Sequence, residues 1–377
     1  MDTPNSELQA MLRETLARFL SEHAGFERHR SLHADDATWS PDTWRALAED
    51  IGLLGAAFPE SIGGFGGGAV ENMIVMEEMG RALALEPYLS TAIMAGEALK
   101  RADRDTLELQ RELVAGRLIC AVASDPTDLQ QPSLRILRGS EGLRIEGEAG
   151  QMRDAPFATH ILSTAADPEG GSGCVLVLLP IRRHGIEQRP LRTIDAGWAS
   201  DVTFHQVDLR EEDILASDAA MLCVRIGDAG RAAICAESVG IMEALFASTR
   251  DYLQQREQFG KPLSSFQVLR HRIAEMHVAI DGARAMTMMA ALAMDEKDGD
   301  GREQRIAAAC AHVSVALRKV GQGAIQLHGG IGTTDELPVA HYFRRISATE
   351  ALYGSPDDCL ADYVRHRDGR AAVELAF

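Results

Sequence analysis

Cysteine is scarce in this sequence, and its spacing fits neither a metal site nor a disulfide framework. Six cysteines are spread over 377 residues, between Cys120 and Cys359. None forms a CxxC pair, and none has a histidine at the spacing that zinc sites use. This distribution is typical of free thiols in a reducing compartment. We therefore expect no metal site, no disulfide bonds and a cytoplasmic protein.

Positive charge is also in short supply. The chain has 38 Lys and Arg residues against 56 Asp and Glu residues, which gives a formal net charge of -18. Proteins that bind nucleic acid neutralise its phosphates with Lys and Arg. The balance therefore argues against a nucleic-acid partner. A small anionic ligand remains compatible, because it requires only a local cluster of positive groups.

Features that direct a chain to a membrane are missing as well. No uninterrupted apolar run approaches the roughly 20 residues that a membrane-spanning helix requires. The first ten residues lack the basic and apolar regions of a signal peptide. We therefore expect no membrane partner.

The pattern of apolar residues divides the chain into three parts. Residues 1–116 repeat apolar side chains at helical spacing and contain a helix start at Ser40-Pro41, which predicts a helical domain. Residues 117–218 contain short β-branched and aliphatic segments separated by Gly, Pro, Asp and Ser, which predict a small β-barrel or sandwich. Residues 219–377 carry long apolar stripes at helical spacing. The predicted fold class is α+β, with a C-terminal four-helix bundle as the third domain.

The long helices of the third domain are also predicted to support oligomerisation. We expect them over about 227–256, 265–295 and 303–327. They carry many Ala and Met residues on wide apolar faces. Such faces favour more than one packing partner.

Two strings of residues in the third domain indicate a phosphate-containing ligand. The first, residues 252–263, joins two predicted helices and contains Arg256, a cation whose planar fork suits phosphate oxygens. The second, residues 326–338, contains Gly329 and Gly330, where backbone N–H groups can approach an anion closely. Each feature alone is typical of an ordinary helix C-terminus. Their combination on neighbouring helices predicts a pyrophosphate-containing cofactor.

These strings resemble the signatures of the acyl-CoA dehydrogenase family. The family patterns read Tyr-x-x-x-Arg-x-Gln-Phe-Gly-x-Pro-Leu and Gln-x-x-Gly-Gly-x-Gly, and the sequence matches them from Tyr252 and from Gln326. The order and sizes of the three predicted domains extend the resemblance over the whole chain. More narrowly, the chain resembles the small-subunit chains of heteromeric enzymes such as pimeloyl-CoA dehydrogenase. This narrower likeness rests on Phe65–Gly68, Val75–Glu78, Gly80–Ala82, Leu85–Tyr88, Ala236–Glu237 and His341–Arg345.

The resemblance implies the acyl-CoA dehydrogenase fold and an oxidoreductase that carries FAD. Such enzymes remove hydrogens from the α and β carbons of an acyl-CoA and pass electrons to an electron-transfer flavoprotein. A carboxylate base takes the α proton. The two positions at which family members place this base correspond here to Tyr353 and Gly230. A tyrosine with an ordinary pKa of about 10 is a poor proton acceptor at neutral pH, so we expect no catalytic base in this chain's own site.

The β domain departs from the family in a related way. Family members use Thr-Glu-Pro followed by Gly-Ser-Asp to contact the flavin ring, whereas this chain has Ser124–Asp128 at that place. The family's later Gly-x-Lys corresponds to Gly147–Ala149. The resemblance therefore implies that the chain's own flavin pocket is eroded.

The two intact strings belong to the segments that, in the family, reach across the dimer to a neighbour's FAD. The sequence thus predicts a heteromer, with an α2β2 heterotetramer as the natural stoichiometry. A homologous partner subunit would carry the base and hold most of the FAD. This chain would complete that FAD site with Arg256, Gln258, Phe259, Gln267, Gln326, Gly329 and Gly330.

Other polar residues have a functional and a structural interpretation. Glu350 precedes Tyr353 by one helical turn and is the best substitute base, although a pair with Arg344 or Arg345 is the simpler expectation. Glu237 is expected to form a salt bridge in the bundle. For His328 we expect a packed helix end. Four arginines of the β domain are expected on a solvated face, with CoA phosphate binding as the alternative: Arg182, Arg183, Arg189 and Arg192.

Three alternative functions remain open at this point. The first is a homomeric acyl-CoA dehydrogenase that uses Glu350 as its base. The second is another flavin chemistry on the same fold, against which Tyr353 argues. The third is a scaffold subunit without a catalytic role. Dicarboxylyl, steroid side-chain and ring-fragment CoA esters are all compatible substrates, because a fold does not fix a substrate.

Overall fold

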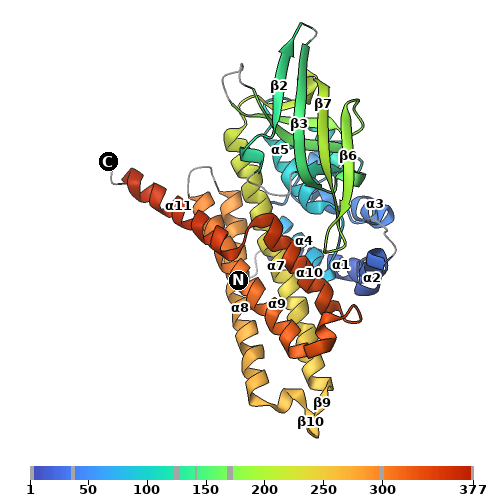
Figure 1. The fold of residues 1–377 in the computed structure, drawn as a ribbon, viewed down its shortest axis with the longest axis vertical. Coiled ribbons are helices and arrows are strands. Elements are labelled where there is room, and N and C mark those ends of the chain that lie inside the picture. Colours follow the sequence, from blue (N-terminus) through green and yellow to red (C-terminus); the bar gives the residue numbers. More distant parts are fainter. Residues whose placement is uncertain are drawn as a thin grey trace. The chain divides into compact units, whose positions relative to one another are not determined.

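The structure, a computed structural model, describes residues 4–34, 39–122, 128–140, 142–167, 173–296 and 301–374. Contacts within the chain divide it into two compact units. The helical unit comprises Met1–Ala37, Ala69–Ala84 and Arg231–Phe377, and the sheet unit comprises Thr38–Gly68 and Leu85–Gly230. Figure 1 shows the elements of both units along the chain.

The helical unit is built around long helices that pack side by side. Helix α9 packs against α8, α10 and α11, and α4 packs against α1 and α8. The elements are α1 (Pro4–His23), α2 (Phe26–Ala34), α4 (Ala69–Ala82), most of α7 (Ala220–Gln255), α8 (Gln267–Asp295), α9 (Arg302–His328), the 3-10 helix η8 (Gly329–Thr333), α10 (Pro338–Tyr353) and α11 (Pro356–Glu374). The observed bounds of α8 and α9 lie within two residues of those predicted from the apolar stripes.

Two glycines let α4 and α7 cross with their backbones in contact. A Cβ atom on Gly240 of α7 would collide with the carbonyl group of Glu77, and one on Gly80 of α4 would collide with the carbonyl group of Glu237. No side chain can be placed at either position without separating the two helices. The crossing therefore depends on glycine at both positions.

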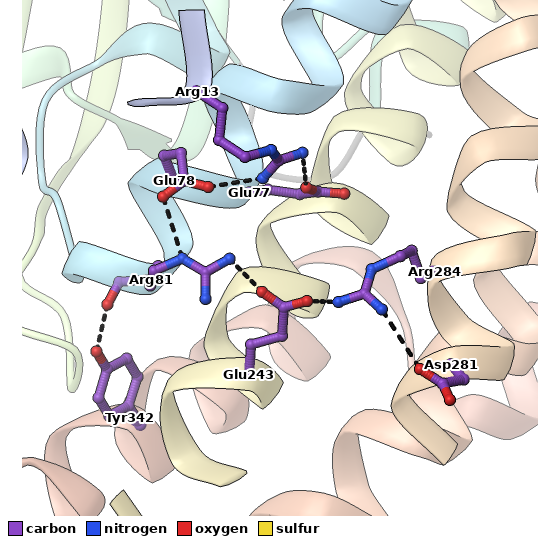
Figure 2. Close-up of polar contacts among 8 residues, drawn as sticks. All are labelled: Arg13, Glu77, Glu78, Arg81, Glu243, Asp281, Arg284 and Tyr342. Carbon is purple, nitrogen blue, oxygen red and sulfur yellow. Dashed lines mark hydrogen bonds and ion pairs between the residues drawn. The ribbon is translucent and has the colours of Figure 1, made fainter. Parts of the chain in front are cut away.

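A chain of ion pairs runs across the same helices, as Figure 2 shows. It links Arg13 of α1, Glu77, Glu78 and Arg81 of α4, Glu243 of α7, and Asp281 and Arg284 of α8. Glu243 is the central member, because it accepts from both Arg81 and Arg284. The network connects four helices, so it fixes their relative positions in addition to neutralising the buried carboxylates.

The sheet unit contains one mixed sheet flanked by short helices. Its strand order is β6-β7-β3-β1-β4-β5-β8, and β2 pairs with both β3 and β4. The strands are β1 (Cys120–Val122), β2 (Leu134–Gly139), β3 (Gly142–Arg153), β4 (His160–Ala166), β5 (Val175–Pro180), β6 (Ile186–Arg192), β7 (Trp198–Leu209) and β8 (Ile214–Ala216). The helical elements are α3 (Pro41–Glu49), the π-helix η3 (Leu89–Ala95), α5 (Gly96–Lys100), α6 (Leu107–Val114) and the short 3-10 helices η1 (Leu53–Gly55), η2 (Glu60–Ile62), η4 (Asp128–Gln130), η5 (Ala155–Phe157) and η6 (Glu211–Asp213).

Both faces of strand β5 are buried, which explains why its sequence is a continuous apolar run. Leu176 and Leu178 belong to a core shared with the flanking helices, whereas Val175, Val177 and Leu179 belong to a core formed by the strands themselves.

The predicted helix start at Ser40 is confirmed, since its hydroxyl accepts a hydrogen bond of 3.1 Å from the backbone N–H of Thr43.

Helix α7 begins earlier than the predicted residue 227. Its first two turns bury Cys223 and Ile226 in the core of the sheet unit. By length and composition α7 is the one helix among the described residues that could cross a membrane, but 72% of its apolar window is buried inside the protein. Charged residues such as Arg225 and Asp228 interrupt the apolar sequence of the helix, and both are buried. This burial is typical of a core helix.

The backbone contact at the glycine crossing generates a prediction about stability. Gly240→Ala should lower the free energy of unfolding by about 3 kcal/mol, because the new methyl group forces α4 and α7 apart. Gly323→Ala is a matched control in α9, since its Cβ would meet only the flexible side chain of Met276 at 3.3 Å. Denaturant unfolding of both variants is the measurement. Equal stability of Gly240→Ala and the unmodified chain would show that the two helices do not touch.

Candidate cofactor-contact site

The first predicted string forms an exposed hairpin at the junction of α7 and α8. Helix α7 ends at Gln255, and the two short strands β9 (Glu257–Gln258) and β10 (Lys261–Pro262) follow. The backbone N–H of Leu263 donates to the carbonyl of Arg256 at 2.8 Å and closes the hairpin. At the tip Phe259 has a φ of 55° and is 89% exposed, which is an uncommon state for a large apolar residue.

The second string ends α9 in an open glycine turn. Helix α9 stops at His328, and Gly329 follows with a φ of 65°, a value that favours glycine. A Cβ atom at Gly329 or Gly330 would meet nothing within 4 Å. Both glycines therefore leave the backbone accessible from outside the chain.

A stack of two rings joins the strings. The ring of Tyr252 in α7 lies against the ring of His328, with 4.5 Å between the centroids and 25° between the planes. The Tyr252 hydroxyl also donates to the carbonyl oxygen of His328 at 3.3 Å. The Nδ1 atom of His328 is 2.9 Å from the carbonyl oxygen of Ala324, so this nitrogen carries the proton and donates. The expectation of a packed, hydrogen-bonded His328 is confirmed.

Burial keeps His328 neutral. It is 4% exposed, and desolvation lowers the pKa of its imidazole below the ordinary value. A neutral ring that stacks on tyrosine does not serve as an anion ligand. His328 instead holds the end of α9 in place against α7.

The seven predicted cofactor residues are all exposed. The Arg256 guanidinium has no hydrogen bond or ion pair within the described part of the chain. Gln267 is the first residue of α8, and Gln326 lines a groove of about 660 Å³ between α8 and α9 that also contains Arg272 and Lys319. The Gln258 amide donates to the carbonyl of Glu257 at 2.8 Å. A guanidinium without a partner and an open glycine turn are each suited to phosphate oxygens.

The two family positions of the base offer no carboxylate. A Cβ atom at Gly230 would lie 3.3 Å from the sulfur of Met94, so Met94 occupies the space that a longer side chain would need. Tyr353 is the last residue of α10 and is followed by Gly354, which has a φ of 91°.

Glu350, the candidate substitute base, is held by an arginine that sequence reasoning did not identify. Arg318 of α9 donates to both Glu350 oxygens at 3.0 Å, which raises the pKa of the Arg318 guanidinium. The predicted partners are engaged elsewhere: Arg344 pairs with Asp335 and Arg345 pairs with Glu237. The expected pair of Glu350 with Arg344 or Arg345 is therefore wrong. Residues 318 and 350 lie on different helices, so periodicity within one helix could not reveal their contact.

Glu237 forms the predicted salt bridge. Its Oε1 accepts from Arg345 at 2.8 Å, and both side chains are buried.

The four arginines of the β domain do not all share a solvated face. Arg183 is bound by Asp213 and is largely buried, whereas Arg189 pairs with Asp201 at the surface. The expectation of a solvated face is therefore wrong for Arg183.

Residues 124–127 of the β domain lie outside the described residues, and so does the side chain of Asp128. The second departure from the family pattern, at residues 147–149, lies within the described residues. Gly147 pairs with Phe204 across strands β3 and β7, and Ala149, where the family has lysine, is 7% exposed and belongs to the core of the sheet unit. A side chain at position 149 thus points into the sheet unit's interior.

Sequence reasoning also missed a cluster of thiols beside Glu350. Cys235 and Cys310 lie 3.7 Å apart between α7 and α9, and with Cys359 they line a cavity of about 30 Å³. Burial raises the pKa of Cys359 to about 12. These thiols are therefore packing groups. Among the described residues, no group of three His, Cys, Asp or Glu side chains is arranged to hold a metal ion.

Comparison with known proteins identifies the family. The model of the acyl-CoA dehydrogenase C-terminal domain matches residues 227–361, and that of the N-terminal domain matches residues 6–104. Acyl-CoA dehydrogenase IpdE2 of Mycobacterium tuberculosis is 30% identical over 95% of this chain and 96% of its own length. A chain of the solved ChsE4-ChsE5 complex of the same organism is 26% identical, with a TM-score of 0.86 and coverage of 99% of both chains.

A glutaryl-coenzyme A dehydrogenase complex with glutaryl-CoA has a TM-score of 0.89, covering 98% of this chain and 97% of that one, and at 22% identity it shows the fold. The predicted fold class is thereby confirmed. With its two family models covering more than half of its length and a relative matching it nearly end to end, the chain belongs to the acyl-CoA dehydrogenase family.

Proposed function

We propose that this chain is the base-lacking subunit of a heteromeric, FAD-dependent acyl-CoA dehydrogenase. In this assignment a homologous partner subunit holds the FAD and supplies the base, and the present chain completes that FAD site. The observation that carries the proposal is the contrast between the two sites. The residues suited to phosphate binding, Arg256, Gly329 and Gly330, are exposed and have no side-chain neighbour among the described residues that blocks them. At the base positions, by contrast, Met94 lies against Gly230, and the substitute Glu350 is bound by Arg318.

The comparisons support a two-chain enzyme. A chain similar to this one over its full length comes from a complex of two differently named subunits, ChsE4 and ChsE5. The acyl-CoA dehydrogenase family uses FAD, which accepts the hydride from the β carbon of the acyl group. An acyl-CoA is the proposed substrate, and an electron-transfer flavoprotein is the proposed electron acceptor.

The role assigned to this chain is binding and orientation of the dinucleotide. The Arg256 guanidinium would neutralise phosphate charge, and the glycine turn would offer backbone N–H groups to the same phosphates. Phe259, exposed at the hairpin tip, would place an aromatic ring against the partner. The Tyr252–His328 stack would keep the arginine and the glycine turn at a fixed separation, so that both contacts form together.

The competing assignments depend on other residues. A homomeric enzyme would require Glu350 as its base, and the pair with Arg318 stands against that role, since both carboxylate oxygens already accept hydrogen bonds from the guanidinium. A scaffold subunit would not use Arg256 at all. These differences allow each alternative to be tested separately.

The first prediction concerns the chain by itself. Purified alone, it should carry much less than one FAD per chain and show no acyl-CoA dehydrogenase turnover, because the flavin ring and the base belong to the partner. Absorbance at the flavin band and dye-linked turnover measure both properties. Stoichiometric FAD together with turnover would establish a homomeric enzyme instead.

The second prediction concerns Arg256 in the co-purified heteromer. Arg256→Ala should weaken FAD binding about tenfold or more, because it removes a charge-assisted hydrogen bond to phosphate. The mass of the heteromer should not change. FAD per complex after dilution is the measurement, and Arg45→Ala, which removes another exposed arginine, is the matched control. Unchanged FAD retention in Arg256→Ala would favour the scaffold assignment.

The third prediction concerns Glu350. Glu350→Gln should leave the kcat of the heteromer within about twofold, because the side chain pairs with Arg318 and takes no proton. Glu296→Gln is a suitable control, since Glu296 also pairs with one arginine, Arg305, through both of its oxygens. A loss of kcat of about a hundredfold or more with normal FAD content would identify Glu350 as the base.

A further inference from the structure

Three of the six cysteines meet at one small cavity of the helical unit. The sulfur of Cys235 in α7 lies 3.7 Å from the sulfur of Cys310 in α9, and Cys359 of α11 lines the same cavity of about 30 Å³. In the reduced chain these thiols pack against one another. Cys310 nevertheless differs from the rest, because it is half-buried whereas the other five cysteines are buried. The cavity has room for a molecule little larger than water.

The surroundings of the pair favour ionisation of Cys310 over Cys235. The hydrogen bond with Cys310 and burial both raise the pKa of Cys235 above its ordinary value, so Cys235 keeps its proton and donates a hydrogen bond to the Cys310 sulfur. Arg231 also lines the cavity, and Asp362 shares its charge. A half-buried thiol that accepts a hydrogen bond near a cation has the surroundings of a reactive cysteine. Cys235 is then placed as its resolving partner.

The pair lies between two helices whose register matters for the candidate site. Cys235 and Cys310 are 75 residues apart in the sequence, and Tyr252 and His328, which stack at the far end, are 76 residues apart. This nearly constant separation shows that α7 and α9 run parallel and keep one register between the two contacts. Cys235 and Tyr252 are separated by 17 residues of α7, which is about 26 Å of helix. A covalent bond between the thiols would therefore fix the end of the helix pair that the ring stack does not hold.

We propose that Cys235 and Cys310 are a disulfide site that responds to hydrogen peroxide. Cys310 attacks one peroxide oxygen and the O–O bond breaks. The other oxygen leaves as water with the thiol proton, so that Cys310 becomes a sulfenic acid. Cys235 then attacks the Cys310 sulfur, the S–S bond forms, and the S–O bond breaks as the hydroxyl group leaves with the Cys235 proton as water. The two thiols lose two electrons in total, and the peroxide is reduced to water.

The disulfide would act on the stability of the helical unit. It would close a loop of 75 residues and so restrict the unfolded chain. It would also keep α7 and α9 in register, and with them the relative positions of Arg256 and the turn at Gly329. In a reducing compartment such a bond is transient and forms under oxidising conditions. The inference does not depend on a partner subunit, because all the reacting groups belong to this chain.

The first test uses the purified, reduced chain. A small excess of hydrogen peroxide should lower the mass of the chain by about 2 Da, because two thiol hydrogens are lost. Alkylation of the remaining thiols in denaturant, followed by peptide mass spectrometry, should then find Cys235 linked to Cys310. Dithiothreitol should reverse both changes. The result requires no variant, so it does not depend on how well a variant folds.

The sheet unit supplies an internal control for this test. Cys174 and Cys223 also share a hydrogen bond, but both are buried. They should therefore remain reduced and be alkylated. A link between Cys310 and Cys359, or a sulfinic acid at Cys310 without any link, would overturn the proposal. So would oxidation of Cys174 and Cys223 ahead of Cys310, because exposure would then not select the reacting thiol.

The second test measures the effect of the bond on stability. Peroxide should raise the unfolding midpoint of the unmodified chain by about 5 °C. Cys310→Ser should abolish this rise, whereas the matched control Cys359→Ser, which changes another thiol of the same cavity, should retain it. The midpoints of both variants under reducing conditions show whether they fold. A rise that persists in Cys310→Ser, or a linked chain whose midpoint does not rise, would show that this bond does not tie the two helices.

Discussion

The contact between the backbones of α4 and α7 at Gly80 and Gly240 is the constraint on which the helical unit depends. Because the two helices touch, Glu243 on the next turn of α7 can accept from Arg81 of α4 and from Arg284 of α8 (Figure 2). The same crossing thus fixes α8 through a shared carboxylate. The hairpin that carries Arg256 connects α7 to α8, so both of its ends are held in place by these helices.

A second contact, between Tyr252 and His328, connects these packed helices to the candidate site. Tyr252 lies nine residues, about two and a half turns, after Glu243 on α7 and stacks on His328 at the end of α9. Burial lowers the pKa of His328 and so favours the neutral imidazole in this stack. Arg256 and the turn at Gly329 are therefore positioned by buried contacts, although their own surfaces are exposed. Preorganised groups of this kind lose little entropy when they bind a ligand.

The sequence allowed prediction of those features that depend on local pattern. The bounds of α8 and α9 followed from apolar periodicity, and the helix start at Ser40 followed from its residue types. The residues of the candidate site followed from two motifs and a family resemblance. Contacts between distant segments could not be predicted in this way. Neither the Arg318–Glu350 pair nor the Met94 side chain beside Gly230 leaves a signal in either segment, because each depends on how separate elements pack.

The proposed division of labour between two chains accounts for the pattern of exposure. A chain that removed the α proton in its own site would need a carboxylate with free oxygens at the base position. Here Glu350, one helical turn before Tyr353, is held by Arg318, and Arg256 and the glycine turn are open. Exposed Phe259 would be a liability for a solitary chain, since exposed apolar surface promotes association. The same side chain becomes favourable when a partner covers it.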